Sequence, residues 1–173
     1  MITKLEAISF LKQHQPMPDD KELGKNDIEK YEEIRKFFID NPDEECIPLF
    51  LNSFGDKDGF GVYQMVEDVM SMYEAEKVLP HILKALQNEH NGIKYWNVQI
   101  AANSPDQRLF MPLSKLVLDE DVDIKMASIS SLAQLAINDI NKAEVTDILK
   151  QVCEETEDED LKDFAEEVLR DIQ

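Results

Sequence analysis

Residues 78–136 contain one helix-pair pattern written twice. The first copy reads VLPHILKAL (78–86) followed by GIKYWNVQIAA (92–102), and the second reads FMPLSKLVL (110–118) followed by DIKMASISSLAQLA (123–136). Pro80 and Pro112 hold the same place in the two copies, 32 residues apart. Self-similarity at a fixed period is typical of arrays in which each unit buries its apolar face only against its neighbours. The stretch therefore predicts stacked helix pairs.

The pattern continues on both sides of this stretch. Pro48 lies a further 32 residues before Pro80, and VTDILKQV (145–152) matches LPHILKAL (79–86) with Thr146 in the place of the proline. A proline inside a helix costs ~3 kcal/mol in isolation, so three helix-interior prolines in register indicate a required bend. We expect one all-α domain over residues 1–173: an N-terminal helical cap at 1–40, then helix pairs at 43–73, 74–104, 105–138 and 141–173.

Several polar residues are predicted to begin helices. Thr3 and Glu6 have the spacing of a capping box, in which each side chain bonds the backbone N–H of the other residue. Asn26, Ser104 and Thr156 each precede an amphipathic run and are predicted N-caps. We expect about ten helices in total and find no segment with the alternation of a strand.

The chain is strongly acidic, with 37 acidic residues against 18 basic ones and a formal charge of −19. That charge repels phosphate backbones and anionic membranes, so we expect neither nucleic acid nor membrane as a partner. Basic proteins would be attracted. Solubility is the alternative explanation of the charge. Ten acidic residues lie between Glu154 and Gln173, where a terminal repeat needs a polar outer face.

The location predicted for the chain is the cytoplasm. Cys46 and Cys153 lie in apolar settings without CxxC spacing, which is typical of reduced core cysteines. The first residues do not resemble a signal peptide. No run of 18 apolar residues could span a membrane.

No motif in the sequence predicts catalysis, a metal or a cofactor. His14, His81 and His90 are scattered, and no nucleophile, phosphate-loop or dinucleotide fingerprint is present. The glycine-rich stretch GDKDGFG (55–61) faintly imitates a calcium loop, but Phe60 stands at the fifth place, where an oxygen ligand is needed. We expect that stretch to be a connection that uses the backbone freedom of glycine.

Aromatic residues near the starts of the second helices are candidate contacts for a protein partner. Trp96 could serve the core alone, whereas Tyr63 and Tyr95 carry polar tips that suit the rim of an interface. The alternative for all three is packing between repeats.

The residues of the repeats resemble a known family. Asp-x-Asp-Ile-Lys-x-x-Ser-x-x-Ser-Leu (121–132) is similar to the HEAT-repeat form Asp-x-x-Val-Arg-x-x-Ala-x-x-Ala-Leu, and HEAT pairs carry a proline in their first helix. The resemblance covers residues 43–173 and is strongest in the third pair. It implies a right-handed α-solenoid with a binding surface lined by the second helices.

A narrower resemblance is to small HEAT-like immunity proteins of bacterial contact-dependent growth inhibition and other polymorphic toxin systems. DGFGVYQ (58–64) and IKYWNVQIAA (93–102) carry it. It implies an antitoxin, a monomer or a 1:1 heterodimer with its toxin, that occludes the cognate toxin domain. If that toxin is a nuclease, carboxylates on the concave surface would mimic phosphates. The candidate partner-binding residues are Tyr63, Glu67, Asp68, Tyr95, Trp96, Gln99, Asp119, Glu120 and Asp121.

Two other functions compete with this hypothesis. A general HEAT-type scaffold or adaptor would dock a peptide or an enzyme subunit with no toxin involved. An enzyme such as a HEAT-like chromophore lyase or DNA glycosylase is disfavoured, because a glycosylase needs a basic groove.

Overall fold

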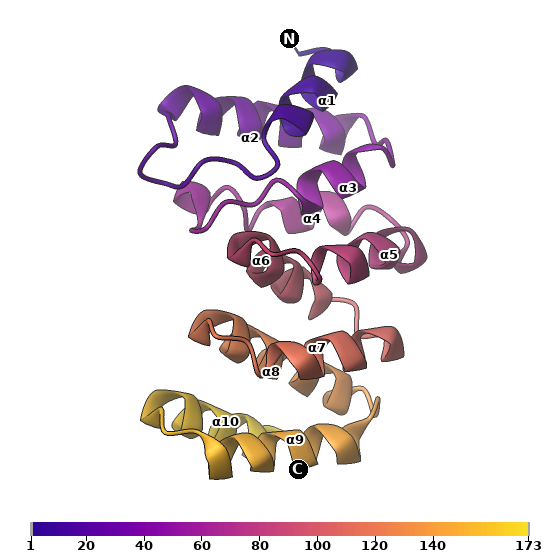
Figure 1. The fold of residues 1–173 in the computed structure, drawn as a ribbon. Helices are drawn as coiled ribbons and strands as arrows, with labels where there is room; N and C mark the ends of the chain where they lie inside the picture. Colours follow the sequence, from indigo (N-terminus) through magenta and orange to yellow (C-terminus); the bar gives the residue numbers. More distant parts are fainter. Residues whose placement is uncertain (1, 173) are drawn as a thin grey trace. The chain divides into compact units, whose positions relative to one another are not determined.

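The computed structural model of the chain describes residues 2–172. Within that range the backbone forms ten α-helices and two short 3₁₀ helices, with no strand, so the predictions of an all-α fold and of about ten helices are confirmed. The chain divides into two compact units, Met1–Asn97 and Val98–Gln173, and the division falls inside α6. Figure 1 shows the helices in chain order.

The first unit contains five whole α-helices and most of a sixth. These are α1 (Lys4–Gln13), α2 (Lys25–Asp40), α3 (Cys46–Leu51), α4 (Val66–Met70), α5 (Ala75–Ala85) and α6 (Asn91–Ala101), with the 3₁₀ helix η1 (Gly59–Gly61) before α4. Within this unit α3 packs on α1 and on α5, and α2 packs on α4.

An aromatic cluster forms the core of the first unit. Tyr31 stacks edge to face on Phe50 and on Tyr63, with ring centroids 5.7 Å apart in both pairs. Its hydroxyl lies 2.8 Å from Ser53 Oγ, which itself donates to the Phe50 carbonyl, so Tyr31 is the donor of this bond. Edge-to-face pairs add about 0.5–1.5 kcal/mol to the burial of the rings. The cluster thereby ties α2 to α3 and to the segment before α4.

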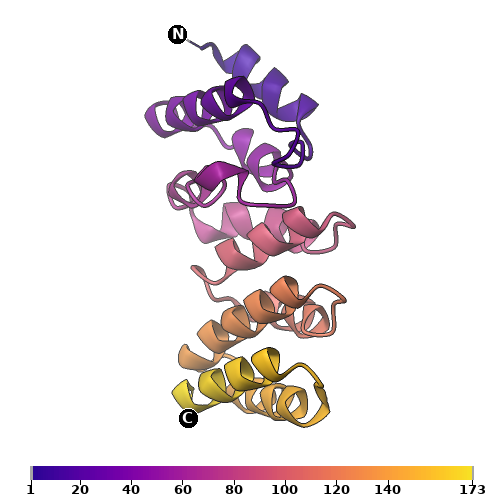
Figure 2. The same cartoon turned by 90° about the vertical axis from the view of Figure 1, so that its left-hand side faces the viewer.

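The second unit contains two helix pairs and the end of α6. The 3₁₀ helix η2 (Gln107–Leu109) leads into α7 (Phe110–Leu116), which packs on α8 (Val122–Ile137), and α9 (Lys142–Glu155) packs on α10 (Glu159–Asp171). Helix α8 also packs on α9 and on α10, and Figure 2 shows α8 and α10 side by side. Ser131 on α8 donates to the Val98 carbonyl at 2.7 Å, a buried bond to α6.

The predicted helix starts are partly correct. The Thr3–Glu6 capping box is present, with the Glu6 carboxylate accepting from the Thr3 N–H at 2.8 Å. The other three predicted N-caps are wrong: Gly24, Asp106 and Asp158 hold those positions instead of Asn26, Ser104 and Thr156. Asp106 and Asp158 each lie two residues from the predicted cap, because neighbouring polar residues are equally able to cap. Gly24 also lies two residues from the predicted cap, and it begins α2 without a side-chain bond.

The prolines are not all inside helices. Pro48 and Pro112 stand third in α3 and α7. The backbone N–H groups of the first turn have no partner within the helix, so a proline there loses no hydrogen bond. Only Pro80 lies in the interior of its helix, α5. The interpretation of three bend-forming interior prolines is therefore wrong for Pro48 and Pro112.

Candidate functional site: an acidic end of the second unit

Tyr63 lies in the core of the first unit and not at a rim. Its side chain has no exposed surface, and its ring contacts Tyr31, Phe54 and Trp96. Burial raises the pKa of its hydroxyl to about 12. The expectation that its polar tip meets a partner is wrong, because the neighbouring rings and Gly59, which lies against the Tyr63 ring, enclose it.

Trp96 and Tyr95 are half-buried neighbours on α6. The Trp96 indole N–H donates to the Lys57 carbonyl at 2.9 Å, and its ring lies 6.0 Å from that of Phe54. Trp96 therefore holds the 55–61 connection against α6, which is a structural role. Tyr95 contacts Trp96 edge to face with ring centroids 5.3 Å apart.

Glu67 and Asp68 lie exposed on α4, and Asp68 is engaged within the unit. The guanidinium of the buried Arg35 donates to Asp68 at 3.2 Å and to Glu32 at 2.7 and 2.9 Å. The bonds from Arg35 lower the pKa of Glu32. Other carboxylates of the first unit are similarly paired with basic side chains, namely those of Lys4, Lys12, Lys25, Lys30, Lys36 and Lys77.

The remaining candidates belong to the second unit. Gln99 is exposed on α6, one helical turn after Tyr95. Asp119, Glu120 and Asp121 form the turn between α7 and α8, where Asp121 is the N-cap of α8 and accepts from the Asp123 and Ile124 N–H groups at 2.9 and 3.3 Å. Asp119 accepts from the Asp121 N–H at 3.0 Å.

A second acidic turn lies at the same end of the helices. Helices α8 and α9 run antiparallel, so the α7–α8 turn and the α9–α10 turn come to one end of the second unit, as the left side of Figure 1 shows. We call this the acidic end. Its residues are Asp119, Glu120, Asp121, Asp123, Glu154, Glu155, Glu157, Asp158, Glu159 and Asp160.

The charge of the acidic end is not neutralised locally. The second unit has 18 acidic and seven basic residues, a net charge of −11. Apart from Asp119 and Asp121, no residue of the acidic end has an ion-pair partner in the part of the chain that the structure describes. Carboxylates left in this state create a negative potential that reaches about a Debye length into solvent.

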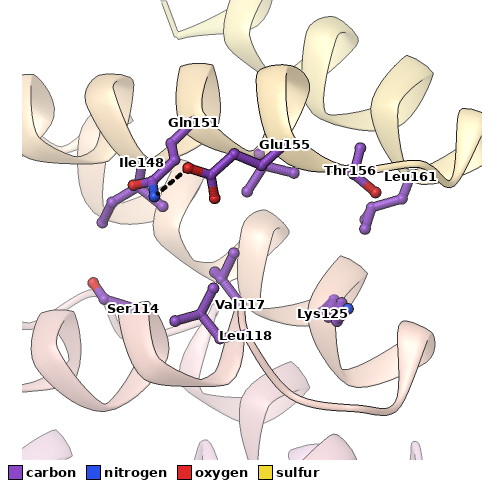
Figure 3. A pocket seen from close by; sticks show the side chains of 10 residues that line it. Ser114, Val117, Leu118, Lys125, Ile148, Gln151, Glu155, Thr156 and Leu161 are labelled. Atoms are coloured by element: carbon purple, nitrogen blue, oxygen red, sulfur yellow. Dashed lines mark hydrogen bonds between the residues drawn. The ribbon is translucent and has the colours of Figure 1, made fainter.

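An open pocket lies between the two helix pairs, next to the acidic end. Its volume is about 320 Å³, and its lining comes from the C-terminal part of α7, from α8, and from the facing parts of α9 and α10. Figure 3 shows Val117 and Leu118 below the opening and Ile148 and Glu155 above it. The Leu118 side chain is 77% exposed.

The sequence predicts only one of the two acidic turns, at residues 119–121, as a contact site, and it does not predict the pocket. The second turn was assigned to the outer face of a terminal repeat. The pocket is lined by residues up to 47 positions apart, from Ser114 to Leu161, and only the packing of α7 and α8 on α9 and α10 brings them together.

The described residues 2–172 contain no group of three His, Cys, Asp or Glu side chains arranged to hold a metal ion. No helix among them is both long enough and apolar enough to cross a bilayer. Comparison of the chain with protein-family models and with curated proteins finds no match.

Proposed function

We propose that this chain is a protein-binding module whose acidic end holds a basic partner protein. The observation that carries the proposal is that Glu120, Glu154, Glu155 and Glu157 of the acidic end are neither caps nor first-turn residues of a helix. Asp121 and Asp158 cap helices, and Asp123, Glu159 and Asp160 lie in first turns, where the helix dipole favours negative charge. Glu120 and Glu157 lie in the turns and have neither role.

Glu154 and Glu155 act against the stability of their own helix. They are the last two residues of α9, and that last turn has no basic residue. The C-terminus of a helix carries partial negative charge, so an acidic side chain there costs roughly 0.3–1 kcal/mol. Lysine or glutamine at either position would not carry this cost. A positively charged partner would offset the cost.

The architecture that we propose for the whole chain is a HEAT-type right-handed α-solenoid. The four ranges 43–73, 74–104, 105–138 and 141–173 each contain two α-helices, which supports this assignment. In the second unit, the packing of the α7–α8 pair on the α9–α10 pair is the contact expected between successive repeats.

Within this class we propose an immunity protein that binds and occludes a basic toxin domain in the cytoplasm, as a 1:1 heterodimer. The resemblance of residues 58–64 and 93–102 to such proteins supports this, together with the carboxylates of the acidic end. A nuclease active site is basic, and carboxylates at its mouth would occupy the places of phosphates. A toxin gene beside the gene of this chain would favour immunity over a general adaptor.

Affinity capture with matched variants tests the proposal. The acidic-end variant carries Glu120→Gln, Glu157→Gln and Glu159→Gln. The control carries Asp139→Asn, Glu144→Gln and Asp171→Asn, which remove the same charge at the opposite end of the second unit, and all six side chains are exposed. Wild type and control should retain the same basic protein from the native host, and the acidic-end variant should lose it. Equal retention by both variants would contradict the proposal.

Co-expression tests the finer assignment. If the captured protein arrests growth when expressed alone, this chain should restore growth and the acidic-end variant should not. If the captured protein is harmless when it is expressed alone, the immunity function is excluded and the adaptor function remains.

A further inference from the structure

The pocket beside the acidic end has an apolar lining that no other part of the described chain covers. Five aliphatic side chains line it: Val117, Leu118, Ile148, Val152 and Leu161. Leu161 is buried, whereas Leu118 is 77% exposed at the opening. Figure 3 shows Val117 and Leu118 coming from one helix pair and Ile148 and Leu161 from the other, with the opening between them. Leu118 is exposed and Ile148 and Val152 are partly exposed, and apolar surface around a concavity is typical of an interaction site.

The size of the pocket limits what could fill it. A volume of about 320 Å³ is at the lower end of the range for ligand pockets. It suits one or two side chains of a partner better than a large cofactor. Five of the ten lining residues are polar or charged, and they would orient a partner segment whose apolar side chain contacts the other five.

The charge around the pocket determines which residues of a partner are favoured next to the one that enters the pocket. Glu155 belongs to the lining and holds its carboxylate toward Gln151, whose Nε2 donates to it at 3.0 Å. Glu120 follows two residues after Leu118, and Glu157 follows one residue after the lining residue Thr156. Lys125 is the only cation of the lining. Three carboxylates in or next to the lining outnumber this one cation, so the charge near the pocket favours positively charged groups.

The same charges disfavour two other occupants. A second copy of this chain would bring its own acidic surface against the acidic end, and like charges across an interface are repulsive. An anionic membrane surface would be repelled for the same reason.

We propose that this pocket is the specificity pocket of the module, which receives one apolar side chain from a partner segment flanked by Lys or Arg residues. This rests on the proposed function and adds the sequence chemistry of the partner to it. The apolar side chain enters between Leu118 and Ile148, and its basic neighbours lie near the carboxylates of Glu155 and of the acidic end.

Selection from a random peptide library displayed on phage tests the inference, with the whole chain immobilised. The selected peptides should contain an aliphatic or aromatic residue with Lys or Arg within a few positions. Leu118→Ser should weaken their binding by about tenfold or more, since truncation at an anchoring contact has effects of this size. Met111→Ser is the matched control, because Met111 is exposed on α7, seven residues before Leu118, but lies outside the pocket lining, and it should leave binding unchanged.

The inference is overturned by peptides without the apolar–basic pattern, by peptides that bind wild type and Leu118→Ser equally, or by a selection that yields no enrichment. Its failure is distinguishable from failure of the proposed function. If the protein captured from the native host binds Leu118→Ser as tightly as wild type, the pocket has no role in binding it. If the acidic-end variant nevertheless loses that protein, the acidic end still binds it and the proposed function stands. If neither substitution matters, both proposals fail.

Discussion

Gly92 and Gly55 lie in backbone contact: a Cβ atom placed on Gly92 would stand 1.8 Å from the Gly55 carbonyl oxygen. Gly92 is in the first turn of α6, and Gly55 begins the 55–61 connection that Trp96 holds through its hydrogen bond to Lys57. Glycine at position 92 permits this approach, because any larger residue there would force the two backbones apart.

Replacement of Gly92 by alanine should therefore destabilise the first unit. We expect Gly92→Ala to lower the free energy of unfolding by about 3 kcal/mol, the upper part of the range for overpacking, since the clash is with backbone and not with a flexible side chain. Urea unfolding followed by Trp96 fluorescence measures it. Gly24→Ser is the control, because Gly24 is the N-cap of α2 with extended backbone, where serine is favoured. A loss no larger than that of Gly24→Ser would show that the close contact does not exist.

The buried Arg35 should not tolerate lysine. Its guanidinium reaches Glu32 on its own helix and Asp68 on α4, and an ammonium group cannot make both contacts with the same geometry. We expect Arg35→Lys to cost about 1–2 kcal/mol. The reciprocal change Lys36→Arg keeps a cation beside the same Glu32 carboxylate at an exposed position, and should alter stability by less than about 0.5 kcal/mol. If the two substitutions change the free energy of unfolding equally, the hydrogen bond from Arg35 on α2 to Asp68 on α4 does not stabilise the unit.

Alkaline pH should destabilise the first unit through Cys46. Burial raises the pKa of this thiol to about 11, from an ordinary value of 9.0. Between these two values the unfolded chain has lost the proton and the folded chain retains it, so the stabilising contribution is complete below pH 9 and is lost as pH rises toward 11. The shift corresponds to about 2–3 kcal/mol.

Unfolding of wild type and Cys46→Ala over that pH range measures this contribution. The difference between the two curves reports the thiol together with Tyr73, whose hydroxyl lies 3.5 Å from the Cys46 sulfur. The gap between wild type and Cys46→Ala should narrow with rising pH, and a constant gap would assign the alkaline loss to other groups.

Ser131 should matter to the second unit more than its neighbour Ser130 does. Ser131 Oγ is buried and donates to the Val98 carbonyl, 33 residues away, whereas Ser130 Oγ donates to Met126 within its own helix. We expect Ser131→Ala to cost about 1–2 kcal/mol and Ser130→Ala to be near neutral. Thermal unfolding followed by circular dichroism compares the two variants. Equal melting temperatures would show that the hydrogen bond from Ser131 to Val98 does not stabilise the second unit.

The helical fold was predictable from sequence because the signals for it are local. The 32-residue spacing of Pro48, Pro80 and Pro112 places one proline in each of α3, α5 and α7, although two of these prolines lie in first turns and not in helix interiors. Thr3 and Glu6 bond each other across one helical turn, which the sequence alone specifies. The N-caps at 24, 106 and 158 were missed because adjacent polar residues offer the same local chemistry, and packing of the whole helix decides between them.

The candidate site was less predictable. Tyr63 has a polar tip and an apolar ring, and only the tertiary packing of Tyr31, Phe54 and Trp96 around it makes it a core residue. Glu154 and Glu155 looked like terminal charge in the sequence. The packing of α8 on α9 places both residues at the same end as Glu120, which makes them part of the acidic end.

The association rate constant of the captured partner tests the central claim most directly. It should be measured by stopped flow with wild type, the acidic-end variant and the opposite-end control, at low and at high salt. We predict that the rate with wild type and control falls by about tenfold or more as salt rises, and that the acidic-end variant associates slowly at both salt concentrations. A rate that is independent of salt, or one that all three proteins share, would contradict a binding surface built on the carboxylates of the acidic end.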